Sequence, residues 1–311
     1  MLFLPEADVR RLLDLGLLLD RLEHAFVELS AGRASVPARI AAHSVDGLLG
    51  TMPGYLDGIL EAKLVSVFPG NHAQGLPSHQ ALIALFDATT GSPLAIIDGT
   101  HITAVRTGAA TAVSTRWLAR PDARVLAVLG AGVQGRSHLQ ALARVRDFSE
   151  IRIASRNPDH ARALAAELGA IAMPSLEAAA RGADVVCFCT DATSPVSSRD
   201  WFGPGVHVTS VGSSAGGPEL DPATIRAADV LAVEHRDAFR PHPGGAHELQ
   251  GLDPAAAAEL GEIIAGTRPG RTSPAQLTVY KSMGHAVEDA VAADLVYRAA
   301  LAQGAGTEVA L

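Results

Sequence analysis

Three basic side chains in otherwise apolar surroundings could bind the carboxylate of a small acid and transfer a proton at its reacting centre. Arg39, Lys63 and Arg106 each lie in or beside a stretch of small and aliphatic residues. Lys and Arg are rarely buried without a partner, and Arg offers a forked donor to a carboxylate. A desolvated Lys near other cations has a lowered pKa, which suits carbonyl or imine chemistry. The set fits an α-amino or α-imino acid, with both arginines on the carboxylate and Lys63 beside the reacting centre, although each residue taken alone could also be a surface charge.

A glycine motif that directly follows an apolar run indicates a dinucleotide site. The run Val125–Leu129 is typical of a buried parallel strand, and Gly130, Gly132 and Gly135 come after it. In this motif the first glycine permits a tight turn, the second lets the backbone approach a pyrophosphate, and the third allows a helix to pack closely on the strand. A helix over about 134–145 would then point its N–H groups at the phosphates. The predicted cofactor-binding residues here are Gly130, Gly132, Val133, Gln134 and Gly135.

The end of the next strand distinguishes the two nicotinamide cofactors. We expect that strand over 150–154, followed by Ser155 and Arg156, with no carboxylate before Asp159. An acid at this position binds the ribose 2′-hydroxyl, whereas an Arg accommodates a 2′-phosphate and can stack on the adenine. We therefore predict that Ser155 and Arg156 belong to the cofactor site and that NADP(H) is preferred, with NAD(H) as the alternative. The competing interpretation is that Arg156 is only a solvated charge at a strand end.

Composition and charge exclude several classes of protein. A chain of 311 residues suits two domains. A net charge of −8 without a Lys/Arg run disfavours a nucleic-acid partner. The N-terminus does not resemble a signal peptide, and no apolar run is long enough to span a membrane. Cys187 and Cys189 are expected to be buried core thiols of a cytoplasmic protein. No metal is expected, because His235, His242 and His247 have no usual ligand spacing.

The expected elements divide the chain into two domains. Two helices over 6–30, strands near 39–43, 47–52, 60–68, 80–87 and 93–97, and a helix over 100–118 form an α+β domain. From 119 onward strands and helices alternate, which implies a parallel, Rossmann-like sheet. The predicted fold class is α/β, with domain boundaries at 1–118 together with 285–311 and at 119–284. We also expect a loop over 236–251, a helix over 254–266, a long helix over 285–302 that opens near Glu288 and Asp289, and a frayed tail after Gln303.

Several motifs together resemble the ornithine cyclodeaminase/mu-crystallin family. In chain order they are Lys63–Asn71, Pro77–Gln80, Asp98–Ala110, Leu129–Gln134, Glu219–Asp221 and Lys281–Asp289. The resemblance covers nearly the whole chain. It implies an NAD(P)-dependent enzyme acting on amino or imino acids, such as a cyclodeaminase, an alanine dehydrogenase or a ketimine reductase. It also implies a homodimer built through the first domain, which then serves in substrate binding and dimerisation.

The resemblance also implies roles for single residues. Arginines like Arg39 and Arg106 bind the substrate carboxylate, and a lysine like Lys63 lies beside the reacting centre. Ser214 stands where cyclodeaminases carry a catalytic Asp, and it cannot act as a base at neutral pH. The mu-crystallin-like ketimine reductases also lack that acid, carry an Arg after the second strand and favour NADPH. The residues expected to line the nicotinamide pocket are Thr190, Gly212, Ser213, Lys281 and Met283.

Three functional hypotheses follow. The first is NADPH-dependent reduction of a ketimine or cyclic imine carboxylate to an amino acid. The second is an oxidative cyclodeaminase or amino-acid dehydrogenase, in which Glu219 or Asp221 replaces the missing acid. The third is an NADPH-dependent protein that only binds a small acid. His79 either contacts the substrate or makes a structural hydrogen bond, and Glu288 and Asp289 are expected to serve their helix dipole or contact the first domain rather than to act in catalysis.

Overall fold

The computed structural model describes residues 1–212, 217–241 and 244–310. They form two compact units. The first unit comprises Met1–Arg106 and His285–Leu311, and the second comprises Thr107–Gly284. The boundary between them falls within helix α3, Gly99–Leu118. None of the described helices is long and apolar enough to span a membrane.

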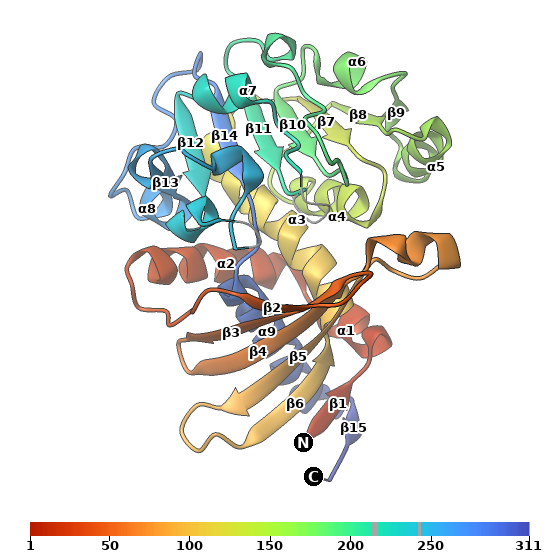
Figure 1. Ribbon diagram of the computed structural model, residues 1–311, viewed down its shortest axis with the longest axis vertical. Helices are drawn as coiled ribbons and strands as arrows, with labels where there is room; N and C mark the ends of the chain where they lie inside the picture. The colour runs from red at the N-terminus through yellow and green to blue at the C-terminus, as the bar shows by residue number, and fades with distance from the viewer. Residues whose placement is uncertain (213–216, 242–243, 311) are drawn as a thin grey trace. The chain divides into compact units, whose positions relative to one another are not determined.

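The first unit is built on a seven-stranded sheet with the strand order β15-β1-β6-β5-β4-β3-β2 (Figure 1). Neighbouring strands from β2 to β6 pair antiparallel. The bounds are β1 Leu2–Leu4, β2 Ile40–His43, β3 Leu48–Leu56, β4 Ile59–Val67, β5 His79–Asp87, β6 Pro93–Asp98 and β15 Thr307–Glu308. Strand β3 continues four residues beyond the predicted end at Met52. The reason is a two-residue hairpin at Asp57 and Gly58, whose φ angles of 49° and 81° suit such a turn.

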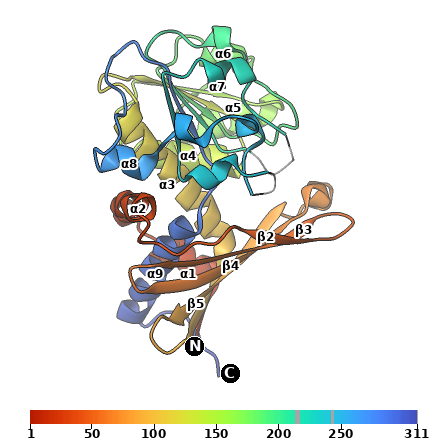
Figure 2. The same cartoon turned by 60° about the vertical axis from the view of Figure 1, so that its left-hand side comes forward.

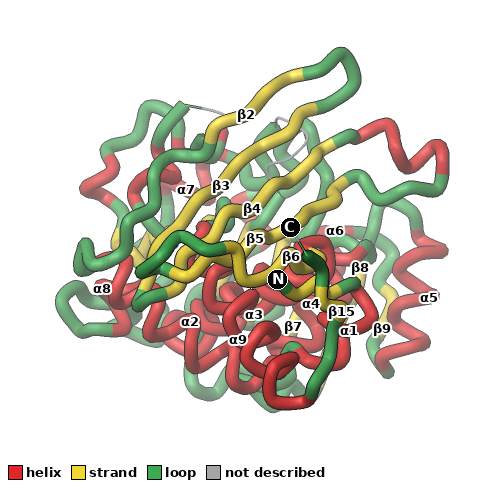
Figure 3. Tube along the Cα trace, turned by 90° about the horizontal axis from the view of Figure 1, so that it is seen from below, coloured by secondary structure: helices red, strands yellow, loops and turns green. Residues whose placement is uncertain are grey.

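In the part of the chain that the structure describes, helices cover one face of this sheet. They are α1 Glu6–Leu12, α2 Leu15–Ser30 and α9 Ala286–Gln303, and a short 3₁₀ turn covers Pro69–Gln74. Helix α9 packs against β3, β4 and β5, and α1 and α2 pack against α9 (Figure 2). Buried and exposed residues alternate along the strands, so that Met52, Ile83 and Leu85 face the helices. The opposite face, which we call the outer face, has no described helix of the unit over it (Figure 3).

The predicted fraying after Gln303 is wrong. Gly304 ends α9 in the left-handed conformation, and the following residues form β15. There Phe3 is the antiparallel partner of Thr307, and the Val309 N–H donates to the Met1 carbonyl over 2.9 Å. Residues 307–309 are held in place because β1 offers them unpaired backbone N–H and C=O groups at the edge of the sheet.

The second unit contains an eight-stranded parallel sheet with the order β13-β12-β14-β11-β10-β7-β8-β9 (Figure 1). Its strands are β7 Val125–Leu129, β8 Glu150–Ala154, β9 Ile171–Ala172, β10 Val185–Phe188, β11 His207–Ser210, β12 Val230–Val233, β13 Ala258–Glu259 and β14 Thr278–Lys281. Its helices besides α3 are α4 Val133–Leu142, α5 Pro158–Leu168, α6 Leu176–Ala180, α7 Pro222–Arg226 and α8 Leu260–Ile264. The strand order reverses between β7 and β10, which is where such sheets bind ligands. The predicted Rossmann-like sheet is confirmed.

Small residues let α3 approach α4 closely. A Cβ on Gly108 would lie 2.6 Å from Ser137 Oγ. Thr111 Oγ1 and His138 Nε2 are 2.9 Å apart and join the two helices. Cys187 and Cys189 are free and buried in the same unit.

The predicted helix over 254–266 is wrong. A 3₁₀ turn covers Pro254–Ala256, β13 follows, and only Leu260–Ile264 is α-helical. Glu259 and Glu262 form a capping box that fixes the helix start at Leu260. The expected loop over 236–251 contains two further 3₁₀ turns, Arg236–Phe239 and His247–Leu249.

Candidate functional site

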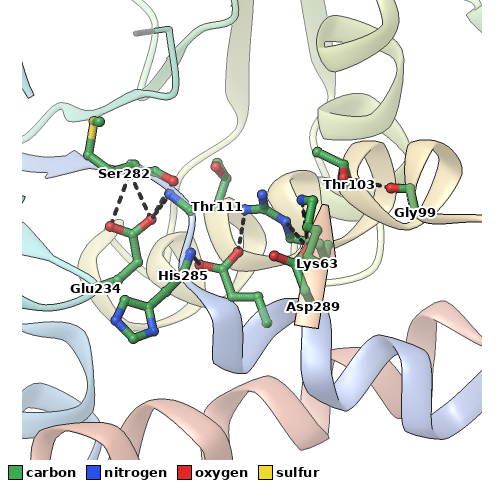
Figure 4. A network of polar contacts seen from close by, with 12 residues as sticks. Lys63, Gly99, Thr103, Thr111, Glu234, Ser282, His285 and Asp289 are labelled. Carbon is green, nitrogen blue, oxygen red and sulfur yellow. Dashed lines mark hydrogen bonds and ion pairs between the residues drawn. The ribbon is translucent and has the colours of Figure 1, made fainter. Parts of the chain in front are cut away.

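Lys63 lies fully inside the first unit. It is 1% exposed, and the alternation of β4 points it toward α9. Its ammonium donates to Oδ1 of Asp289 over 3.0 Å (Figure 4). An ammonium has three N–H donors, and this is its one hydrogen bond to a residue within the described ranges. Two donors of a buried lysine are therefore left for a ligand.

Arg106 joins the same group of side chains. Its Nε donates to Asp289 Oδ1 over 3.1 Å and its Nη1 to Glu288 Oε2 over 2.9 Å. The other carboxyl oxygen of Glu288 accepts from the His285 N–H over 2.9 Å, which caps α9 (Figure 4). Arg106 is 5% exposed, and both carboxylates are fully buried. We call Lys63, Arg106, Glu288 and Asp289 the cation cluster.

The charges of the cation cluster alter one another's protonation. Burial, reinforced by the charge of Arg106, lowers the pKa of Lys63 to about 8, although Asp289 opposes the shift. Burial alone would raise the pKa of Asp289, but Arg106 and Lys63 outweigh it and hold that pKa below its ordinary value. At neutral pH the cluster therefore contains an ammonium that loses its proton readily and a carboxylate that stays ionised.

The other two residues predicted for substrate binding lie elsewhere in the first unit. Arg39 is half-buried and directly precedes β2. His79 is the first residue of β5, and its Nδ1 is 3.1 Å from Ser78 Oγ. The roles of both remain predictions, and Ser214 lies outside the described residues.

In the second unit, the turn between β7 and α4 has the form that a dinucleotide pyrophosphate requires. Gly130 has a φ of 119°, and a Cβ there would lie 2.3 Å from the Cys189 carbonyl oxygen. A Cβ on Gly135 would lie 2.0 Å from the Gly130 carbonyl oxygen. Around Gly132, in contrast, a Cβ would meet nothing within 4 Å. The first and third glycines are thus needed for packing, and the second leaves open space at the start of α4.

The neighbouring residues also fit a nucleotide. Val133 is 69% exposed at the start of α4, which is a surface that a bound nucleotide would cover. Oε1 of Gln134 is buried without a partner among the described residues. Ser155 is half-buried and Arg156 is exposed at the carboxyl end of β8. No ion pair of Arg156 exists within the described part of the chain, so its guanidinium is available for a phosphate.

A buried carboxylate, Glu219, holds the carboxyl ends of β10 and β11. It accepts hydrogen bonds from Thr190 N and Oγ1, each over 2.6 Å. It also accepts from Ser210 Oγ and Gly212 N, each over 2.7 Å. Thr190 and Gly212, both predicted to line the nicotinamide pocket, are brought together by this side chain. Ser213, predicted with them, lies outside the described residues.

Lys281 and Met283 lie at the end of β14. Lys281 is fully buried. Its ammonium donates to Ser210 Oγ over 2.9 Å and to the Gly212 carbonyl over 2.6 Å, and it is 3.2 Å from Glu248 Oε1. The Met283 N–H donates to Glu234 over 3.0 Å (Figure 4). The ammonium of Lys281 is thus engaged by protein groups, and it fixes the start of the segment that follows β11.

Sequence reasoning predicted only part of what the acidic residues around these groups do. Glu288 and Asp289 were expected to serve the helix dipole or to contact the first domain. Both contact it by pairing with the buried cations Lys63 and Arg106, and this pairing was not predicted. The sequence did contain a signal for these partners. The two acids lie in the first turn of the last helix, and the residues on either side of them in 286–293 are all Ala or Val. Glu61 was also missed, although its position two residues before Lys63 on a strand places both on one face.

One group of potential metal ligands occurs in the described part of the chain, His24, Glu28 and Asp57. Glu28 is already bound to the Arg33 guanidinium through both carboxyl oxygens, each over 2.6 Å. His24 and Asp57 are exposed and paired with each other over 2.7 Å. We assign no metal to them.

Known proteins resemble this chain over its whole length. The model of the ornithine cyclodeaminase/mu-crystallin family matches residues 1–304. Ketimine reductase mu-crystallin of Mus musculus is 40% identical over 296 residues, which cover 91% of each chain.

Two solved structures share the fold. Delta(1)-pyrroline-2-carboxylate reductase of Thermococcus litoralis, in complex with NADH and L-proline, matches with a TM-score of 0.93 and 36% identity. The match covers 99% of this chain and 100% of that one. An archaeal alanine dehydrogenase dimer with bound NAD matches with a TM-score of 0.88 and 30% identity, over 100% of this chain and 99% of that one.

Proposed function

Because the chain belongs to the ornithine cyclodeaminase/mu-crystallin family, we propose that it reduces the C=N bond of a ketimine or cyclic imine carboxylate with NADPH. The observation that carries this proposal is the buried ammonium of Lys63, which keeps two N–H donors beside Arg106. The similarity to ketimine reductase mu-crystallin and to a reductase solved with L-proline supports the same substrate class.

The residues of the cation cluster have complementary tasks in this reaction. Arg106, together with Arg39, binds the substrate carboxylate through charge-assisted hydrogen bonds. Lys63 keeps the imine nitrogen protonated, which makes the adjacent carbon the better electrophile. Glu288 and Asp289 fix the orientation of the two cations and balance their charge. His79 is a further candidate for substrate contact.

The residues from Gly130 to Gly135 would hold the cofactor pyrophosphate, and Arg156 its 2′-phosphate. A bound nicotinamide cofactor supplies the hydride. The preference for NADPH rests on Arg156, which is exposed at the end of β8 without an ion-pair partner among the described residues. Solved relatives with NADH or NAD bound make NAD(H) the alternative cofactor. Lys281 would act on the cofactor indirectly, through the Gly212 carbonyl that it binds.

An amino-acid dehydrogenase running in the oxidative direction is the second candidate. It is favoured by the lowered pKa of Lys63, about 8, because the neutral amine formed above that pH can accept a proton. An ornithine cyclodeaminase would need an acid in the segment after β11. Glu219 is committed to Thr190, Ser210 and Gly212, and Asp221 caps α7 by accepting from the Thr224 N–H. Neither Glu219 nor Asp221 is therefore a good replacement for the catalytic Asp in whose place this sequence has Ser214.

The test is a substrate panel. We expect NADPH oxidation with the five- or six-membered cyclic imine carboxylate and no ammonia release from ornithine with NAD. Lys63→Ala should lose most of kcat while it still binds NADPH. Ammonia release without imine reduction would establish the cyclodeaminase instead, and binding of imines without any turnover would establish a binding protein.

We further propose that the first unit binds substrate and forms a homodimer, and that the second binds the cofactor. The apolar outer face of the first unit supports this proposal, because Ile40, Leu49, Leu64 and Leu82 are each at least 40% exposed on it. The related archaeal alanine dehydrogenase was solved as a dimer.

A further inference from the structure

A third carboxyl group, that of Glu61, lies near the cation cluster and has no part in the mechanism above. Glu61 is 2% exposed. It precedes Lys63 by two residues on β4, so both side chains point toward α9. Buried glutamates are rare unless they are paired, so this side chain requires an explanation.

Gly54 makes room for the Glu61 carboxyl group. The two residues are register partners on β3 and β4. A Cβ on Gly54 would lie 3.1 Å from Glu61 Oε1 and 3.1 Å from the Cβ of Ala286. The carboxyl group therefore lies between β3 and the first turn of α9. Asp289 follows Ala286 by three residues and lies on the same side of that helix.

The hydrogen-bond partners of these carboxyl groups are incomplete. Neither oxygen of Glu61 accepts a hydrogen bond from any residue that the structure describes, and Oδ2 of Asp289 is in the same condition. An ionised carboxylate buried without donors is costly, whereas a protonated one carries its own donor. Burial raises the pKa of Glu61 well above its ordinary value, and the negative charge of Asp289 adds to the effect.

The charges around Glu61 lead to the same conclusion. The charged groups that act on Glu61 are Asp289 on α9 and Lys63 on β4, and both belong to the cation cluster with Arg106 and Glu288. Its register partners on β3 and β5, Gly54 and Leu85, are uncharged. Two cations and two anions balance one another, so an ionised Glu61 would leave a net negative charge where an anionic substrate must bind.

We propose that the carboxyl group of Glu61 is protonated in the working protein and that its O–H donates a hydrogen bond to Oδ2 of Asp289. Glu61 is thus a positioning residue, because it holds Asp289 in the orientation in which Oδ1 binds Lys63 and Arg106. Its effect on turnover rests on the proposed function, but its protonation state does not.

The protonation state can be measured without turnover. Infrared spectra of the wild-type protein at neutral pH are expected to contain the carbonyl band of a protonated carboxylic acid, and Glu61→Gln should abolish it. Glu177→Gln, a change of an exposed glutamate on α6, is the control and should retain it. If the wild-type protein lacks the band at neutral pH, Glu61 is ionised and the proposal is wrong.

The positioning role can be measured from two further variants. Glu61→Gln keeps an N–H donor for Asp289 and should leave kcat for imine reduction within about threefold of wild type, with an unchanged alkaline limb of its pH profile. Glu61→Leu removes the donor and should lower kcat about tenfold, the effect of one hydrogen bond, and shift that limb. Equal profiles of the two variants would overturn the positioning role. An infrared band in a protein that turns over no imine would contradict the proposed function and leave the protonated Glu61 intact.

Discussion

The proton on Lys63 determines the expected pH dependence of catalysis. Burial is the main cause that lowers its pKa to about 8. Because the ammonium form keeps the imine protonated, kcat/KM for reduction should be constant near neutral pH and fall as the pH rises through about 8. Oxidation of the corresponding amino acid needs the neutral amine and should rise over the same range. Steady-state rates in both directions check this, and a parallel fall in both would exclude Lys63 as the titrating group.

Arg156 should determine the choice of cofactor. Arg156→Ala removes charge-assisted hydrogen bonds to the 2′-phosphate, so KM for NADPH should increase about tenfold to a hundredfold while KM for NADH stays nearly constant. Arg162→Ala is the matched control, since Arg162 is an exposed arginine on α5. A wild-type protein that already prefers NADH would contradict the assignment.

The sequence was enough to predict the cations of the candidate site but not the carboxylates that pair with them. Lys63 and Arg106 could be selected because cations in apolar elements need a partner, and the structure buries both. Their partner Asp289 is more than 180 residues away from either one in sequence. Strand and helix periodicity give the face on which a side chain lies, but not which distant element packs on that face. For that reason the pairing of these cations with Glu288 and Asp289 could not be predicted from the sequence and required the structure.

At the scale of elements, Glu219 is expected to stabilise the edge of the parallel sheet where β10 and β11 end. Glu219→Gln replaces one of the two acceptor oxygens with an NH₂ group, which presents N–H donors either to Thr190 or to Ser210 and Gly212. Since hydrogen bonds to a charged group contribute about 1.5–3 kcal/mol each, the free energy of unfolding should fall by about 3 kcal/mol or more. Urea denaturation measures the change, and KM for NADPH should increase with it. The exposed Glu177→Gln is again the control, and an unchanged unfolding midpoint in Glu219→Gln would refute this role.

Elements with a strong local signal were predicted, and those that depend on distant pairing were not. The run Val125–Leu129 and its glycines gave β7 and α4. The tail strand β15 exists because β1 offers it a partner from the other end of the chain. The alanine-rich segment before Leu260 has high helix propensity, yet Ala258 and Glu259 pair with β12 instead. Tertiary pairing outweighed local preference in both segments.

At the scale of the whole molecule, the apolar outer face of the first unit leads us to predict that two copies of the chain associate. Leu64 and Leu82 are register partners on β4 and β5 and are 40% and 48% exposed. An apolar sheet face without a covering helix is typical of an association surface, and in a twofold dimer it would pack on its own copy. We therefore expect the wild-type protein to have the mass of a dimer in solution.

A charged pair at the centre of that face should prevent association. The double variant Leu64→Lys/Leu82→Lys places two ammonium groups on each copy, which would be buried against one another across the twofold axis, so it should have the mass of a monomer. Leu301→Lys is the matched control, because Leu301 is 57% exposed but lies on α9, which packs on the opposite face of the sheet. Light scattering after size-exclusion chromatography measures each mass. If the double variant is still a dimer, the interface lies elsewhere on the molecule. If the wild-type protein is a monomer, the proposed dimer is wrong. The chemistry assigned to the cation cluster would not change, because its four residues belong to one chain.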